Sequence, residues 1–168
     1  MPNYCDNKVT IIGHKEDLDI MEDEKLTFSK FVPRPADQEE NWYEWNNAHW
    51  GTKWEHAEYE LLMREDNIYV AAFRTAWAPP LAFFEALLKL YPRSWIKCQF
   101  REEDCLAGVW VGYMKSGKLV EKGSTWLEPM PYLTTTGEIY IPEEAEAETE
   151  TTTKPDHDVE IDLTKNSL

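Results

Sequence analysis

Residues 41–54 read NWYEWNNAHWGTKW and hold four of the eight tryptophans in the chain. Large aromatic side chains are ordinarily spread over several strands and helices. This density therefore indicates either a small core of stacked rings or a surface that grips a flat group. We call residues 41–54 the Trp-rich segment. It falls between two regions of regular pattern, which predicts an insertion over about residues 33–55.

The region before the Trp-rich segment predicts one strand and one helix. Residues 8–12 are a β-branched run that is typical of a strand. Residues 15–24 suit a short, acidic helix that depends on packing for stability. A second apolar alternation, over residues 26–32, indicates an extended segment. The prolines at positions 33 and 35 then predict an irregular chain.

The region after the Trp-rich segment has the clearest periodicity. Apolar residues at spacings of three and four, directly after a Pro-Pro pair, predict a helix over residues 81–91. The other patterns predict strands that pair as hairpins. These strands are expected over residues 56–64, 68–75, 95–101 and 107–114, with a further one over 118–121.

Helices interleaved with antiparallel hairpins indicate an α+β fold in which helices cover one face of a sheet. A ferredoxin-like antiparallel sheet of the βαββαβ type, with two helices on one face and the Trp-rich insertion, is the simplest arrangement of this kind. We expect this domain to span residues 1–128. An acidic, low-complexity extension is expected over residues 129–168.

The formal charge of −15 comes from 32 acidic and 17 basic residues. Residues 134–168 carry ten acids and two lysines, so both the tail and the rest of the chain are acidic. Such a surface repels phosphate, which disfavours direct nucleic-acid binding and favours a protein partner.

The three cysteines form no Cys-x-x-Cys pair, which fits a reducing compartment. The start of the chain has no secretory pattern, and no stretch reaches the roughly 18 apolar residues that span a bilayer. We expect an intracellular protein, in the host cytoplasm or in a virion. Cys98 lies in an apolar strand pattern, which predicts an inert, buried thiol.

Three motifs resemble one known family. They are MPNYCDNKVT at residues 1–10, WGTKW at 50–54 and FRTAWAPP at 73–80, followed by an apolar helix pattern. In this order they resemble the plasmid YubB and phage Api92-like family over about residues 1–115. The resemblance implies a ferredoxin-like domain from a plasmid, phage or other virus. It implies no catalytic residue or cofactor.

The Trp-rich segment is the first candidate binding site. The functional interpretation is a stacking platform for a base, a sugar or a proline of a partner, with Trp42 and Trp45 the most exposed. The structural interpretation is a small core made by Trp45, Trp50, Trp54 and Trp77, and we favour it. The candidate interaction surface consists of Trp42, Tyr43, Trp45, Trp50 and Trp54.

The acidic extension is the second candidate. Residues 143–153 repeat Glu, Ala and Thr, and their like charges keep such a segment from folding alone. Two short β-like stretches lie in the extension, and an alternating aliphatic triplet resembles peptides that add a strand to a partner's sheet. The alternative is a solvated tail. The candidate residues are Ile139, Tyr140, Ile141, Val159, Ile161 and Leu163.

Catalytic and metal-binding patterns are weak. His49 and His56 lie near Glu55 and Glu58, but the spacing matches no zinc motif, and we predict separate histidines and no cofactor. We therefore predict a non-enzymatic interaction protein of viral or mobile-element origin. One form would be a minor virion component whose C-terminal arm docks on partners.

Two other function classes stay open. An acidic inhibitor that mimics DNA and blocks a host nucleic-acid-binding protein would explain the charge, but it requires the acids on one continuous face. A small hydrolase with a Trp-lined pocket would bring His49, His56 and an acid within about 3–4 Å of a shared point near Trp50.

Overall fold

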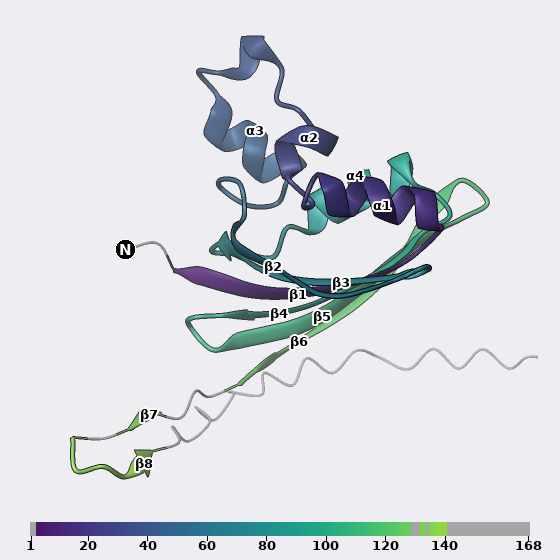
Figure 1. Cartoon of the computed structure of the whole chain (residues 1–168). Helices are drawn as coiled ribbons and strands as arrows, with labels where there is room; N and C mark the ends of the chain where they lie inside the picture. Colours follow the sequence, from purple (N-terminus) through teal and green to yellow (C-terminus); the bar gives the residue numbers. More distant parts are fainter. Residues whose placement is uncertain (1–2, 129–131, 134, 141–168) are drawn as a thin grey trace, which may run out of the picture.

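The computed structural model describes residues 3–128, 132–133 and 135–140. Over these residues the chain is an α+β protein with a six-stranded antiparallel sheet and four α-helices (Figure 1). The strands are β1 (Tyr4–Ile12), β2 (Ala57–Glu65), β3 (Ile68–Ala76), β4 (Trp95–Glu102), β5 (Leu106–Lys115) and β6 (Lys118–Leu127). The helices are α1 (Lys15–Asp23), α2 (Phe28–Phe31), α3 (Trp42–His49) and α4 (Leu81–Leu90), with a 3₁₀ turn η1 (Ala36–Gln38) before α3.

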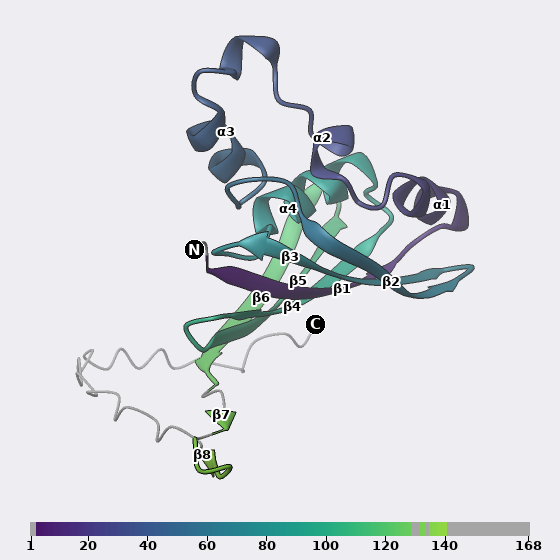
Figure 2. The same cartoon turned by 60° about the vertical axis from the view of Figure 1, so that its left-hand side comes forward.

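The strands follow the order β2-β3-β1-β4-β5-β6, and every neighbouring pair is antiparallel. All four helices lie on the same side of this sheet, and the opposite side carries none of them (Figures 1 and 2). The predicted α+β class and the antiparallel sheet with one helix-covered face are confirmed. The sheet has six strands, because β5 and β6 extend it as a hairpin beyond β4.

The core lies between the sheet and the helices. Along β1, Cys5, Val9 and Ile11 are buried on the helix side, as the period of two in a strand requires. Phe28 of α2 stands at the centre, with ring centroids 4.5 Å from Phe83 and 6.2 Å from Phe73. Fully burying a side chain of this size contributes about 1.5–3 kcal/mol, so such contacts hold the helix layer on the sheet.

The prediction of an extended segment over residues 26–32 is wrong. Phe28–Phe31 form helix α2, because the Glu55 carboxylate accepts hydrogen bonds from the backbone N–H groups of Phe28 at 2.7 Å and Ser29 at 3.1 Å. A carboxylate at this end of a helix satisfies N–H groups that have no partner within the helix. The local alternation is overridden by a residue distant in sequence.

The number of helices also differs from the prediction of two. The insertion over residues 33–55 contains η1 and α3, so it is more regular than its prolines suggest. Helix α3 buries Asn46, whose side-chain amide donates a hydrogen bond of 2.8 Å to the Lys53 carbonyl. This bond joins the helix to the loop that follows it and makes the Trp-rich segment one compact unit.

The C-terminal extension is described only in part. Ile139–Tyr140 form strand β8, which pairs with β7 (Tyr132–Leu133) in a small separate hairpin, and Ile139 is 74% exposed. The candidate residues Ile141, Val159, Ile161 and Leu163 lie outside the described residues. Within the described part of the chain, no helix is long and apolar enough to cross a membrane.

Glycines make room for aromatic rings at the β4–β5 end of the core. Phe100 on β4 pairs with Gly108 on β5, and a Cβ on Gly108 would lie 2.4 Å from the end of the Phe100 ring. Its other near neighbour would be the carbonyl oxygen of Ser124 at 2.9 Å. A backbone atom on one side and a buried ring on the other leave no room for a methyl group.

We therefore predict that Gly108→Ala lowers the free energy of unfolding by about 1–3 kcal/mol, the usual cost of overpacking a core. Urea denaturation followed by tryptophan fluorescence measures it. Ser124→Ala, at an exposed position on the neighbouring strand, is the control and should change stability little. Equal stability of Gly108→Ala and the wild type would contradict this packing.

Candidate functional site

The centre of the Trp-rich segment is anchored to the core. Trp50 is only 5% exposed, and its indole N–H donates a hydrogen bond of 2.9 Å to the Val32 carbonyl. The Trp50 carbonyl accepts a hydrogen bond from the N–H of Phe83 in α4 at 3.3 Å. The side chain and the backbone of Trp50 thus tie the insertion to the helix layer.

Gly51 and Thr52 complete this anchor. Gly51 has a φ of 81°, and a Cβ there would lie 3.1 Å from the backbone nitrogen of Leu81 at the start of α4. Both facts require glycine. The buried Thr52 hydroxyl donates to the Ala76 carbonyl at 2.9 Å and accepts from the Ala76 N–H at 3.1 Å. These bonds attach the Trp-rich segment to the end of β3.

Beyond this anchor, aromatic rings surround a lysine. The Lys53 ammonium lies 4.9 Å from the ring centroid of Trp54, 5.3 Å from Trp77 and 5.7 Å from Tyr43. These distances are within the range of cation–π attraction. Trp42 packs edge-on against Tyr43 at 5.9 Å. We call Trp42, Tyr43, Lys53, Trp54 and Trp77 the aromatic surface.

The local backbone turns Trp77 outward. Trp77 follows β3 with a φ of 70°, a left-handed conformation that is uncommon for a bulky residue. Its N–H donates to the Asn3 carbonyl at 2.9 Å, and the Thr75 hydroxyl donates to the Ala78 carbonyl at 2.7 Å. As a result Trp77 is 48% exposed, and the prediction that it fills the core is wrong.

The structure divides the predicted interaction surface. Trp42 and Tyr43 are exposed, Trp54 is half-buried beside Lys53, and Trp50 is buried. Trp45, which stood in both the exposed and the core interpretation, is half-buried, with its ring stacked at 4.2 Å on His49 and edge-on at 5.8 Å to Trp50. Lys53 and Trp77 complete the surface, although the sequence patterns predict a core position for Trp77 and indicate no role for Lys53 beyond the WGTKW motif.

A pocket adjoins Trp77. It has a volume of about 290 Å³ and is lined by Asn3, Trp77, Glu102 and Asp104. Burial raises the pKa of Glu102, and the nearby Asp104 raises it further through its charge and a hydrogen bond. An aromatic face beside two carboxylates suits a cationic group, which would relieve the repulsion between them.

The histidines serve separate structural roles. His49 stacks on Trp45, and its Nδ1 lies 2.8 Å from the Trp45 carbonyl. The His56 Nε2 donates to the Lys25 carbonyl at 3.0 Å, while the Glu55 carboxylate caps α2. Among the described residues, no group of three or more His, Cys, Asp or Glu side chains could hold a metal ion.

The cysteine thiols Cys5 and Cys98 are buried in the core. Burial raises the pKa of Cys5 to about 12 and raises that of Cys98 as well. Both thiols are therefore protonated at neutral pH and lack the thiolate that nucleophilic chemistry needs. The prediction of a buried, inert Cys98 is confirmed.

Comparison with known proteins leaves the fold and this geometry as the basis for function. No family model matches the chain, and neither the curated proteins nor the solved structures give a match.

The burial of Trp50 predicts a large effect on stability. Trp50→Ala should lower the free energy of unfolding by about 3–5 kcal/mol, because it removes a buried ring and leaves the Val32 carbonyl without its donor. Trp42→Ala, at an exposed position in the same segment, is the matched control and should cost far less. Urea denaturation followed by far-UV circular dichroism compares them, and equal losses would contradict the division of the segment.

His56 predicts a pH dependence of stability. Burial lowers the pKa of His56, and its Nδ1 is buried without a hydrogen-bond partner among the described residues. The unfolded chain then binds a proton more readily than the folded chain. The contribution of His56 to the free energy of unfolding should therefore be fully present above the ordinary histidine pKa of about 6.5. It should be lost as the pH falls from there through the lowered pKa.

Thermal unfolding between neutral and mildly acidic pH tests this dependence. His56→Phe should flatten the profile, since Phe28 and Phe73 already surround the ring with aromatic contacts. His14→Gln changes an exposed histidine and should keep the wild-type profile. A profile that is unchanged in His56→Phe would overturn the assignment.

Proposed function

We propose that this chain is a non-enzymatic interaction protein that binds a protein partner through the aromatic surface. The observation that carries this proposal is the exposure of Trp42, Tyr43 and Trp77 on a support held by Trp50 and Thr52. Tryptophan and tyrosine are enriched among the residues that dominate binding energy at protein interfaces. A rigid mount reduces the entropy lost when such rings are covered.

The backbone at Trp77 adds support. A left-handed conformation in a non-glycine residue costs on the order of 1–3 kcal/mol and persists where the surroundings impose it. Here the cost places a large ring in solvent, where it contributes little to the core. Strain that exposes an apolar side chain favours a role in binding over a role in folding.

The adjoining pocket indicates the chemistry of the partner. Glu102 and Asp104 lie beside Trp77, and the chain as a whole carries a charge of −15. A lysine or arginine of the partner would place its cation between the ring and the carboxylates, while apolar groups cover Trp42 and Tyr43. The overall field would also speed the approach of a basic partner.

The origin of the protein belongs to the same proposal. The order β2-β3-β1-β4, with α1 and α4 as the connecting helices, supports a ferredoxin-like assignment for this part of the sheet. The WGTKW and FRTAWAPP motifs meet in space through the bonds between Thr52 and Ala76. Both points favour the YubB and Api92-like resemblance, and with it a viral or mobile-element protein such as a minor virion component.

The acidic extension of residues 129–168 is proposed as a second contact, an arm that reaches the partner beyond the domain. Its alternating residues Val159, Ile161 and Leu163 would add a strand to a sheet of the partner. The composition of this region, rather than its structure, supports the idea.

The proposal is tested by affinity capture from host or infected cells, followed by mass spectrometry. We expect the combined variant Trp42→Ala, Tyr43→Ala and Trp77→Ala to lose the specific partner while keeping the wild-type circular dichroism spectrum. Trp126→Ala removes an equally exposed tryptophan from β6 and is the matched control. Retention of the partner by the folded triple variant would refute the aromatic surface as its binding site.

A further inference from the structure

The side of the sheet away from the helices has an unusual charge. We call it the open face, formed by the side chains of β1, β3, β4, β5 and β6 that point away from the helix layer. Since side chains alternate along each strand, the registers place seven basic residues and one acid on it. In a chain with 32 acids and 17 bases, this is a marked local excess of positive charge.

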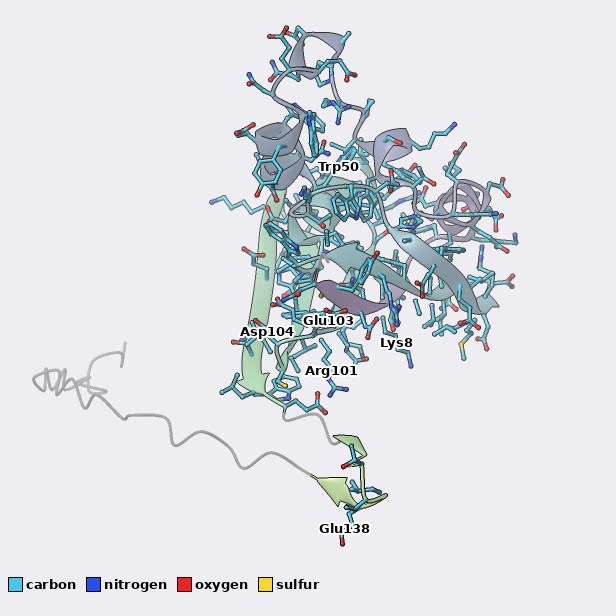
Figure 3. The ribbon with its side chains drawn as sticks, turned by 90° about the vertical axis from the view of Figure 1, so that its left-hand side faces the viewer. Lys8, Trp50, Arg101, Glu103, Asp104 and Glu138 are labelled. Carbon is cyan, nitrogen blue, oxygen red and sulfur yellow. The ribbon has the colours of Figure 1, made fainter. Side chains whose placement is uncertain are left out.

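Four of the basic residues form a strip across the sheet, which we call the basic strip. Lys8 on β1 lies opposite Gln99 on β4, which puts Lys8 diagonal to both Lys97 and Arg101. Val111 lies between Lys97 and Lys122 in the same cross-strand row. Lys8 and Arg101 lie close together on the side of the sheet away from Trp50 (Figure 3).

Within the described residues, none of the four members of the basic strip forms a salt bridge, although Asp6 lies opposite Arg101 in the register. The one acid of the open face, Asp6, is paired with Arg74 at 2.8 Å. The acids of the edge strand β2 lie beyond β3, and one of them, Glu58, also pairs with Arg74. Neighbouring like charges destabilise a sheet, so folding does not explain the strip.

A shallow groove with a volume of about 450 Å³ includes Lys8 and Arg101, two of the four members of this strip. Its lining also includes Asp6 and Gln99 in the middle of the sheet, and Trp126 with Glu128 at the β6 end. Trp126 is 47% exposed and lies on β6, the edge strand next to β5. The groove therefore combines two cations without a salt bridge, an amide side chain, an exposed flat ring and two carboxylates, of which Asp6 is paired with Arg74.

We propose that the open face binds single-stranded nucleic acid in this groove. Phosphates would lie against the basic strip, and an unpaired base would stack on Trp126, as in other binders that combine a cationic groove with aromatic platforms. The carboxylates of an acidic peptide would satisfy the cations, but they lack the large aromatic face that every nucleobase offers to the tryptophan. This site is independent of the aromatic surface, which lies on the helix side.

The proposed site departs from the expectation drawn from net charge. A total of −15 slows the approach of nucleic acid and weakens the complex, but a contact of this kind depends on the charges within a Debye length, about 10 Å at 0.1 M salt. Binding should therefore be moderate and strongly dependent on salt. Four phosphate contacts to a single strand predict a loss of about 50-fold in affinity between about 50 and 200 mM salt.

Fluorescence anisotropy of the full chain with labelled oligothymidylate and oligouridylate of about 16 nucleotides tests this. The combined variant Lys8→Gln, Lys97→Gln and Arg101→Gln should abolish most binding. It should also reduce the slope of log affinity against log salt concentration by about two. Lys25→Gln, Lys30→Gln and Lys89→Gln together change the net charge equally on the helix side and should retain binding. Trp126→Ala should weaken binding about tenfold, whereas Trp42→Ala should not.

Three outcomes would overturn the proposal. One is the absence of saturable binding by the wild type at low salt. Another is an equal loss of affinity in the open-face triple variant and in the helix-side triple variant, which would indicate a nonspecific charge effect. The third is tighter binding of a labelled polyglutamate peptide at the same residues, which would assign the open face to an acidic protein segment. Partner capture through Trp42, Tyr43 and Trp77 would be unaffected by any of these results.

Discussion

The helices cover only one face of the sheet, and the rest of the structure depends on this one-sided burial. Along β1, every second side chain enters the core, where Val9 and Ile11 meet the helix layer. Within the part of the chain that the structure describes, the alternate side chains, such as Lys8, have no helix layer to pack against. The sequence of each strand is thus divided into a set constrained by packing and a set free to take other roles.

The Trp-rich segment shows the same division on a smaller scale. Trp50 and Thr52 face inward, and their hydrogen bonds join the insertion to α4 and β3. Tyr43 and Lys53 face outward from the same short stretch. Binding residues mounted on an anchor of this kind keep their geometry without a large element of secondary structure, which is why so compact an insertion can present two exposed rings, Trp42 and Tyr43, close to Trp77.

The sequence predicted the elements whose patterns are local and left out those that depend on distant residues. The strands, the hairpins and α4 follow from periodicity, and so does the one-sided sheet. Helix α2 does not follow from periodicity, because its first N–H groups are satisfied by the distant Glu55. The exposure of Trp77 does not follow from it either, because it depends on a backbone turn held by Asn3. The basic strip was visible only as an alternation in residues 97–101, whose meaning depends on the register with β1.

If the proposed groove binds nucleic acid, the net charge of this chain is a poor guide to what it binds. An average over 168 residues predicts repulsion of any anion, yet the alternation of the strands gathers Lys97 and Arg101 on the open face, where the one acid of β1, β3, β4, β5 and β6 is paired with Arg74 and further acids lie on the edge strand β2. The aromatic surface lies on the helix side and the groove lies on the other, so occupation of one need not block the other. Under the two proposals, the sheet would separate a protein-binding side from a nucleic-acid-binding side. The chain would then act as an adaptor between a protein and a single-stranded nucleic acid.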